Sequence, residues 1–460
     1  MAPKRNLFHR SRMRSNPAVI LILLLCVVAV LLFNQALARG DVRPVNEPTP
    51  TATRLANSYV LEAQTHFDAG SLAASVAAFQ QAIAADPNNG ALYAELARVV
   101  VYGSEMVTTD EERKERLELA VEYTRQAVEL APESSQAFAV RAFALDWYAT
   151  YVMYTLLDAE QGEQLLADAE QAISRALVLD ETNVHAQIYY AEILVDRMRF
   201  EQAESALRKA LDLAPNLWEA HRVNGLFLEN QGRYEDAIEA FKEAVRLAPN
   251  MTFLYIKLGQ SYRQLGLRST MKPEENPNFP IALEYFAKAV SLNEQLGIED
   301  PYPYLGIGYT YAQLGEFFVA SRNMERALTI NPNSPRVYGD LGMVARQGSN
   351  YEMAIDALSC AVRGCTAEVS CIVRQCNDEI DPQITITGMA LNANTVTYYF
   401  TYASLLAGMH IPGHKVRSKY CPEAIEVINE ILAVPTFANE PIITSILDEG
   451  TAICASYGYK

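Results

Sequence analysis

The longest apolar stretch of the chain lies near its beginning. Residues 18–33, AVILILLLCVVAVLLF, are sixteen consecutive apolar residues, and five Lys or Arg residues precede them. The 22 residues from Pro17 to Ala38 would form a helix long enough to cross a hydrocarbon core about 30 Å thick. The basic flank predicts that the N-terminus stays in the cytoplasm and that the rest of the chain is exported. The pattern therefore predicts a single-pass membrane protein with an extracytoplasmic body.

Cleavage of this segment is the alternative. Residues 36–38 form an A-x-A pattern, so a signal peptidase could release a secreted protein by cutting near Ala38. The apolar run is slightly longer than the core of a typical signal peptide, which favours an uncleaved anchor. Three prolines then alternate with threonines, and proline disfavours helix in the residue before it. We expect a basic cytoplasmic tail at 1–16, an anchor or signal peptide at 17–38 and a stiff Pro/Thr-rich spacer at 39–54.

Beyond residue 55, apolar positions recur with the period of amphipathic helices, and the helices come in pairs. Three pairs end alike, in LDLAPN at 211–216, VRLAPN at 245–250 and LTINPN at 328–333. Small or large apolar residues stand at the same offsets in each pair: Ala191, Ala203, Leu207 and Ala210 before Pro215; Gly225, Ala237, Phe241 and Ala244 before Pro249; Gly308, Ala320, Met324 and Ala327 before Pro332. A small residue lets the partner helix approach, and a large one fills the remaining gap. The pattern predicts repeated pairs of packed helices.

This repeat resembles the tetratricopeptide repeat, because the first two prolines are 34 residues apart and the residue types match. The resemblance covers residues 55–364 and continues more weakly to 434. It implies an all-α, right-handed superhelical solenoid of about eight to nine helix-turn-helix repeats after the single transmembrane helix. The ninth repeat is degenerate, built from 394–409 and 421–434. We expect the solenoid at 55–364 and a cysteine-rich region with a capping helix at 365–460.

The resemblance also implies a binding surface. In this family the first helix of each pair lines a concave groove that holds an extended peptide or a helix. Carried onto this sequence, the variable positions of those helices are Arg222, Glu229, Phe253, Gln260, Arg263, Tyr302, Tyr309, Arg336 and Arg346. Arg and Tyr dominate many binding hot spots. We therefore expect a protein or peptide ligand here, with the four arginines attracting an acidic or carboxylate-bearing segment. The Lys and Asn pair with which some members clamp a C-terminal carboxylate is absent.

Three repeats are longer than the others. Extra residues lie at 104–115, in a first helix lengthened through Tyr154, and at 267–279. Such insertions lie at the edges of a solenoid, where we expect tolerated surface loops, with binding loops as the alternative. The lengthened helix carries aromatic residues at helical spacing, which favours a core over a ligand cage: Phe138, Phe143, Trp147, Tyr148, Tyr151 and Tyr154.

The net charge of −17 is unevenly distributed. Residues 1–43 hold seven basic residues and one acidic residue, so 31 of the 38 basic and 54 of the 55 acidic residues remain in 44–460, a charge of −23. An acidic body repels a phosphate backbone, and no Lys- and Arg-rich stripe with interleaved aromatic residues offsets this repulsion. We expect no nucleic-acid partner.

Six of the seven cysteines lie close to the C-terminal end, and an even number in an exported region indicates disulfides. They are Cys360, Cys365, Cys371, Cys376, Cys421 and Cys454, and 15 connectivities are possible. We expect Cys421 to pair with Cys454, because the helices that carry them should pack side by side. A metal site is the alternative, since His410 and His414 lie downstream of four closely spaced thiols. Their spacing lacks the tightness of zinc frameworks.

Catalytic motifs are missing from the sequence. No G-x-S-x-G, G-x-x-x-x-G-K-S/T, H-E-x-x-H or strand-associated G-x-G-x-x-G occurs, and the six histidines offer little general-base chemistry. The segment from His410 to His414 is typical of a structural turn. We expect no enzyme and no catalytic residue, cofactor or metal. The sequence predicts a non-enzymatic scaffold or adaptor, of bacterial origin, in envelope or surface complex assembly. The alternative is an exported enzyme, or a redox or metal protein, using the cysteine-rich region.

Overall fold

The computed structural model describes residues 16–38, 55–376 and 383–459. The described residues are helical, apart from turns and one isolated bridge between Cys365 and Ile386. They belong to two units, Met1–Arg54 and Leu55–Lys460. The expected spacer and most of the basic tail lie outside the described residues.

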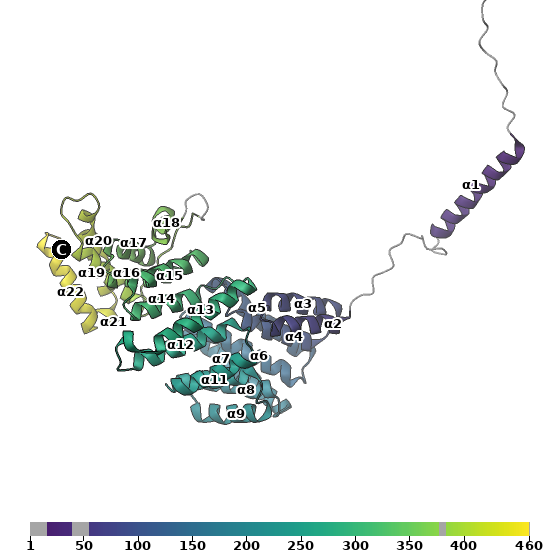
Figure 1. Ribbon diagram of the computed structural model, residues 1–460, viewed down its shortest axis with the longest axis horizontal. Helices are drawn as coiled ribbons and strands as arrows, with labels where there is room; N and C mark the ends of the chain where they lie inside the picture. Colours follow the sequence, from purple (N-terminus) through teal and green to yellow (C-terminus); the bar gives the residue numbers. More distant parts are fainter. Residues whose placement is uncertain (1–15, 39–54, 377–382, 460) are drawn as a thin grey trace, which may run out of the picture. The chain divides into compact units, whose positions relative to one another are not determined.

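The first unit contains helix α1 (Pro17–Ala38) (Figure 1). Its stretch Pro17–Gln35 has a mean hydropathy of 2.9, and no part of it is buried against protein. In the described part of the chain, no other helix is long and apolar enough to cross a membrane. A helix with an almost entirely apolar exposed surface is stable where lipid surrounds it, although an N-terminal signal sequence has the same properties.

The second unit is a run of eight helix pairs, followed by a ninth. The first eight pairs are α2 (Ala56–Asp68) with α3 (Leu72–Ala85), α4 (Gly90–Gly103) with α5 (Asp110–Leu130), α6 (Ser135–Tyr154) with α7 (Ala159–Leu179), α8 (Val184–Asp196) with α9 (Phe200–Leu213), α10 (Trp218–Asn230) with α11 (Tyr234–Leu247), α12 (Thr252–Arg268) with α13 (Asn278–Leu296), α14 (Tyr302–Gln313) with α15 (Phe317–Ile330), and α16 (Pro335–Gln347) with α17 (Tyr351–Val362). Each helix packs chiefly on its partner and on the next pair. The all-α solenoid predicted from the repeat is confirmed.

The small and large residues of the repeat pack as the pattern predicts. A Cβ added at Gly225 would lie 2.6 Å from the nearest ring atom of Phe241, which is fully buried on the partner helix. Gly259 stands in the same relation to Phe286, at 2.7 Å. Glycine is required at these positions because any side chain would push the two helices apart.

The ninth pair is α19 (Val396–Gly408) with α20 (Tyr420–Leu432), and α22 (Pro441–Ser456) packs against both helices. The short elements are η1 (Pro273–Glu275), α18 (Ala367–Arg374), η2 (Arg417–Lys419) and α21 (Pro435–Ala438). Leu447 and Cys454 of α22 are buried in the core of this pair. The last helix therefore covers an apolar face that has no further repeat beside it.

The solenoid coils far enough for its first repeats to touch its later ones. Asn250 donates a side-chain hydrogen bond to the carbonyl oxygen of Asp68 at 3.3 Å, across 182 residues of sequence. The hydroxyl of Thr108 donates to the carbonyl oxygen of Glu299 at 2.8 Å. The concave side of this unit is thus enclosed by protein on more than one side.

Candidate binding groove

The concave side of the first six repeats is filled by the protein's own aromatic rings. One ring comes from each first helix: Phe67 (α2), Tyr102 (α4), Phe143 (α6), Tyr189 (α8), Trp218 (α10) and Phe253 (α12). Ring centroids are 4.2 Å apart for Phe143 and Tyr189 and 4.9 Å apart for Tyr102 and Trp218. All six side chains are buried. This aromatic core fills the centre of that part of the solenoid.

Two buried ion pairs lie within the aromatic core. Arg98 donates to Glu219 at 2.9 Å, although the two residues are 121 positions apart. Burial raises the pKa of the Glu219 carboxyl, and nearby Arg98 offsets only part of this rise. Arg222 donates to both carboxylate oxygens of Glu192, at 2.7 and 2.6 Å. Both arginines are paired with carboxylates inside the protein.

Arg222 was expected to attract an acidic ligand in the groove, but it is buried and paired. It is 3% exposed, and Glu192 neutralises its charge. A guanidinium in this setting cannot attract an acidic segment from solvent, because its field is cancelled locally. Of the four arginines expected to attract an acidic ligand along the first helices, Arg222 does not contribute.

Open space lies beside the aromatic core. Three neighbouring cavities, of about 320, 280 and 600 Å³, are here named the inner, middle and outer cavities. Thr155, at the end of α6, lines all three, so they lie next to one another, and together they are here named the groove. Their volumes are in the range of sites that take a peptide side chain or a small molecule.

Five of the nine residues expected on the basis of the repeat meet in the middle cavity. They are Gln260 and Arg263 of α12, Tyr302 and Tyr309 of α14, and Arg336 of α16. The guanidinium carbon of Arg263 lies 5.3 Å from the centre of the Tyr309 ring, a cation–π contact. The register of the repeat thus brings together residues that lie on three successive first helices.

A carboxylate fixes the position of the Tyr309 hydroxyl through a hydrogen bond. It donates a hydrogen bond to Asp340 of α16, and the hydroxyl of Tyr398 donates to the same carboxylate at 2.7 Å. Burial, followed by the neighbouring charge of Asp340, raises the pKa of Tyr309. The tyrosine therefore stays neutral and presents a fixed flat face to the middle cavity.

The other expected residues lie in different places. Phe253, 3% exposed, and Arg222 line the inner cavity from the aromatic core. Glu229 accepts a hydrogen bond from the Ser261 hydroxyl, and Arg346 is exposed to solvent. Neither Glu229 nor Arg346 is among the residues that line the three cavities.

The second wall of the groove comes from the insertion at 104–115. Glu105 and Arg113 line the inner cavity, and Thr108 and Asp110 line the middle one. Two apolar residues of the insertion, Met106 and Val107, are buried at 7% and 3% exposure, which holds the segment against the solenoid. We expected a surface loop. The apolar pair was the signal for a packed segment.

The aromatic residues of α6 divide between two roles. Phe143 belongs to the aromatic core, as expected. Trp147 and Tyr151 also pack in the core but line the inner cavity as well, and Tyr154 lines that cavity while being 70% exposed. Helical spacing alone could not separate these roles, because the cavity forms only where the insertion and α12 meet α6.

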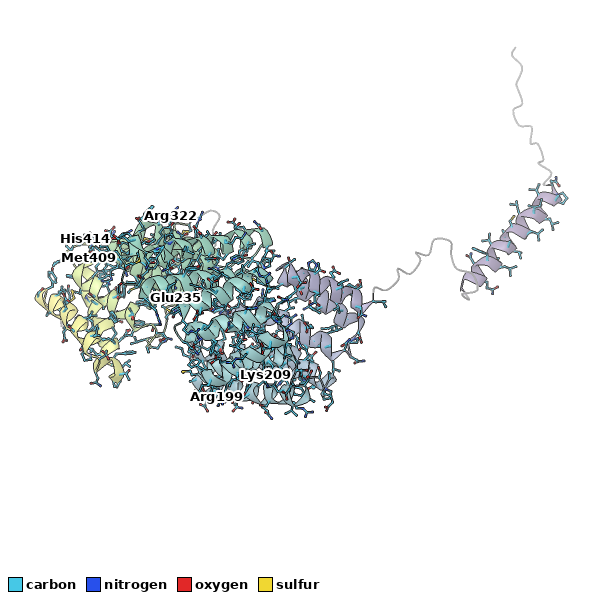
Figure 2. The ribbon with its side chains drawn as sticks, turned by 60° about the horizontal axis from the view of Figure 1, so that its bottom comes forward. Arg199, Lys209, Glu235, Arg322, Met409 and His414 are labelled. Carbon is cyan, nitrogen blue, oxygen red and sulfur yellow. A yellow bond between two sulfur atoms is a disulfide. The ribbon has the colours of Figure 1, made fainter. Side chains whose placement is uncertain are left out.

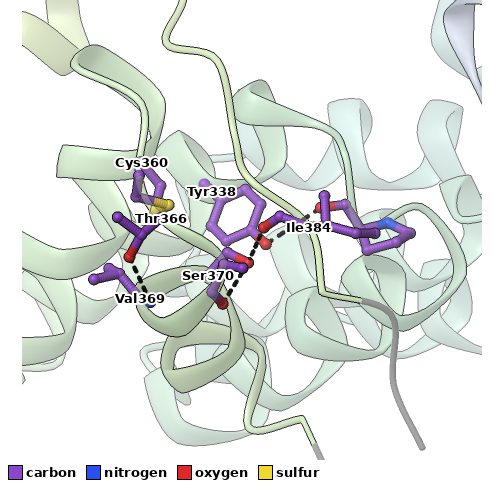
Figure 3. Close-up of a disulfide and its surroundings, with 9 residues drawn as sticks. Tyr338, Cys360, Thr366, Val369, Ser370 and Ile384 are labelled. Carbon is purple, nitrogen blue, oxygen red and sulfur yellow. Dashed lines mark hydrogen bonds between the residues drawn. A yellow bond between two sulfur atoms is a disulfide. The ribbon is translucent and has the colours of Figure 1, made fainter. Parts of the chain in front are cut away.

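The cysteines of the second unit are joined in three pairs: Cys360 with Cys365, Cys371 with Cys376, and Cys421 with Cys454. Around the first pair, the hydroxyl of Ser370 donates to the carbonyl oxygen of Ile384 (Figure 3). The third pair joins α20 to α22, across the contact that was expected for it.

The two C-terminal histidines have structural partners. His410 is buried, and its Nδ1 accepts a hydrogen bond from the backbone N–H of Cys421 at 3.1 Å. His414 lies exposed on the turn that precedes α20 (Figure 2), where its Nδ1 accepts from the backbone N–H of Arg417 at 3.1 Å. Across the described residues, no cluster of three His, Cys, Asp or Glu side chains could hold a metal ion.

Comparisons with known proteins point to the same repeat. Tetratricopeptide-repeat family models match residues 56–89, 191–252 and 302–334. No curated protein matches the chain in sequence.

Among solved structures, a human IFIT1 dimer with m7Gppp-AAAA has a TM-score of 0.53 and 14% identity, covering 86% of this chain and 81% of that one. A thermophilic TPR protein of Thermus thermophilus has a TM-score of 0.36 and 16% identity, covering 45% of this chain and 98% of that one. A tetratricopeptide repeat protein of Parabacteroides merdae has a TM-score of 0.37 and 16% identity, with 63% and 98% covered. At these identities the likeness shows the fold alone.

The 34-residue register, the small-to-large helix contacts and the matched family models agree. The chain is a tetratricopeptide-repeat protein.

Proposed function

We propose that this protein is a non-enzymatic scaffold that takes an extended segment of a partner protein in the groove. The convergence of Gln260, Arg263, Tyr302, Tyr309 and Arg336 on the middle cavity carries the proposal. Tetratricopeptide repeats serve as protein-interaction scaffolds, and the groove presents Arg and Tyr, the residue types that anchor many interfaces.

The groove suits a chain more than a compact ligand. It consists of three adjacent cavities that share Thr155 as a lining residue. A segment lying in it would contact first helices on one wall and the 104–113 segment on the other. An extended chain that contacts both walls buries more surface than one side chain in one cavity.

We further propose that α1 anchors the protein in a membrane and that the body lies outside the cytoplasm of a bacterium, in an envelope or surface complex. The apolar stretch Pro17–Gln35 and the basic residues before it support this orientation. Disulfides between Cys360 and Cys365, Cys371 and Cys376, and Cys421 and Cys454 would suit an oxidising compartment. Protease added to intact cells or spheroplasts should then digest the body. Its complete protection would contradict the orientation.

Nucleic acid is not part of the proposal. The human IFIT1 structure contains m7Gppp-AAAA, but its 14% identity carries only the fold. The present chain has a net charge of −17, and Glu105, Asp110 and Asp340 lie in the groove. Carboxylates at these positions repel phosphate.

Site-specific photocrosslinking in cells tests the groove. A photoreactive amino acid at Gln260 of the full chain should give an adduct with a discrete protein. Arg263→Ala with Tyr309→Ala should reduce the yield about 10-fold or more, since the two residues form a cation–π contact that faces the groove. A matched control is available at Arg326 and Tyr304, a similar pair at 5.7 Å that lies away from the groove.

The two double variants distinguish binding from general loss of packing. Arg326→Ala with Tyr304→Ala should leave the crosslink intact. Equal loss in both double variants, or no protein adduct from Gln260, would contradict the proposed groove.

A further inference from the structure

The inner cavity is lined by aromatic side chains and is large enough for one side chain of a ligand. Trp147, Tyr151 and Tyr154 of α6 and Phe253 of α12 give it aromatic surfaces. Tyr154 is 70% exposed, whereas a tyrosine side chain is usually at least partly buried against protein. Its volume is about 320 Å³. Aromatic faces carry negative electrostatic potential, so they attract a cation that lies over them.

Acidic and basic side chains line this cavity in equal number. Three acids line it: Glu105, Glu192 and Asp196. Three cations line it: Arg113, Arg222 and Lys257. Arg222 is bound by Glu192, and Arg113 lies 3.3 Å from Glu105. Among the described residues, neither Asp196 nor Lys257 forms an ion pair, so Asp196 is the lining acid left to meet a further cation.

A further acid, Asp146 of α6, interacts with Asp196 from behind the lining of the cavity, with Arg222 and Arg197 also acting on it. Asp146 is 1% exposed, and neither of its carboxyl oxygens has a hydrogen-bond partner. Asp196, on the next first helix, accepts one long hydrogen bond, from Thr150 at 3.3 Å. Burial, with repulsion from Asp196, raises the pKa of Asp146 well above its usual value. An unpartnered buried carboxyl is costly unless it is protonated or meets a cation.

The groups that face Asp196 come from three other helices as well as its own. Glu192 lies one turn earlier on α8, Arg222 is on α10 and Lys257 is on α12. Burial and then Glu192 raise the pKa of Asp196 to about 7, against the opposite effects of Thr150, Arg222 and Lys257. The neighbouring Arg197 is engaged elsewhere, by Glu163 and by Glu170. Near neutral pH, Asp196 is therefore close to half protonated.

We propose that the inner cavity binds an organic cation, a guanidinium or alkylammonium group, between the carboxylate of Asp196 and the rings of Trp147 and Tyr154. The source of the cation rests on the proposed function: it is an Arg or Lys side chain of the segment held in the groove. The expected specificity is thus for a basic residue at this end of the segment, whereas the middle cavity presents Arg263 and Arg336 to an acidic one.

Small probes test the cavity without knowledge of the partner. N-acetyl-arginine amide carries the guanidinium, and N-acetyl-citrulline amide has nearly the same shape without the charge. Added to the full chain in detergent, the arginine probe should bind saturably by calorimetry and change the fluorescence of Trp147. The citrulline probe should bind at least about 10-fold more weakly. Equal binding of the two probes, or no binding of the arginine probe, overturns the proposal.

Variants locate the site. Asp196→Asn should weaken the arginine probe about 10-fold or more, and Asp212→Asn, at an exposed acid on α9, should leave it unchanged. Binding to the native protein should weaken from pH 8 to pH 6, by up to about 10-fold per unit below pH 7, because protonated Asp196 cannot attract a cation. Asp196→Asn should remove this pH dependence. An unchanged affinity in Asp196→Asn would overturn the proposed site.

The proposed cation site and the proposed partner segment are tested independently. If the arginine probe binds as expected but photocrosslinking from Gln260 finds no protein, the proposed segment is wrong and the cation site stands. If a protein is crosslinked and the arginine probe does not bind, the cation site is wrong and the groove stands.

Discussion

Arg98 connects three parts of the aromatic core, and its removal tests whether the solenoid is held closed from inside. Its guanidinium donates to Glu95 at 2.9 Å on its own helix and to Glu219 at 2.9 Å on α10. It also lies 4.6 Å from the centre of the Phe67 ring on α2. Arg98→Met keeps the apolar stem of the side chain but removes the charge. Glu219, 1% exposed, then loses its cation.

Removing one member of a buried ion pair costs about 3–5 kcal/mol, because the other charge is left without compensation. Glu219→Gln should cost less, about 1 kcal/mol, since a neutral amide oxygen can still accept from Arg98. The double variant should be more stable than the sum of the two single effects by at least about 1 kcal/mol, because no buried charge is then unpaired.

The penalty of Arg98→Met should also depend on pH. Burial already raises the pKa of Glu219, and loss of Arg98 raises it further. A raised folded-state pKa means that the folded protein holds more protons than the unfolded chain. The contribution to stability is then largest at low pH and is lost as the pH rises through the folded pKa. The penalty should therefore be larger at pH 8 than at pH 5.

Tryptophan fluorescence during urea unfolding is the assay, because both tryptophans lie at this core. Trp218 is buried within it, and Trp147 contacts the Phe143 ring at 5.1 Å. Arg125→Met is the control, at an arginine that pairs with acids on the exposed face of α5 and should show no measurable change. Equal effects of Arg98→Met and Arg125→Met, or strict additivity in the double variant, would refute the reasoning.

Three further predictions concern packing, the disulfide and buried charge. Gly225→Ala should destabilise the protein by about 1–3 kcal/mol in chemical unfolding, because the new methyl group meets a buried ring, whereas Gly408→Ala, with no atom within 4 Å, should be neutral or slightly stabilising. Replacing Cys421 and Cys454 together by Ala should lower the stability of the C-terminal repeat by about 3–4 kcal/mol, as expected for a closed loop of this length, and an unchanged unfolding midpoint under oxidising conditions would argue against the bond. Asp146→Asn should raise the melting temperature more at pH 8 than at pH 5, because burial raises the pKa of the native carboxyl and acid favours its neutral form, and an equal shift at both pH values would contradict the buried-charge explanation.

The sequence by itself determined the repeating unit. Each helix pair is defined by local contacts within 34 residues, so the small residue at Gly225 and the large one at Phe241 could be read directly from their spacing. The register of the repeat also placed Gln260, Arg263 and Tyr309 on first helices, and these residues line one cavity. Such features are readable because they depend on short-range periodicity.

Only the tertiary structure decided how much of the concave side is open. The coiling of the solenoid is the sum of small rotations between successive repeats, and no single segment encodes that sum. It brings Arg98 against Glu219 and closes the early repeats around aromatic rings. It also turns the 104–115 insertion into the second wall of the groove. Arg222, which its position in the repeat marked as a groove residue, is neutralised by Glu192 on the preceding first helix, because packing between neighbouring repeats also decides which side chains stay free.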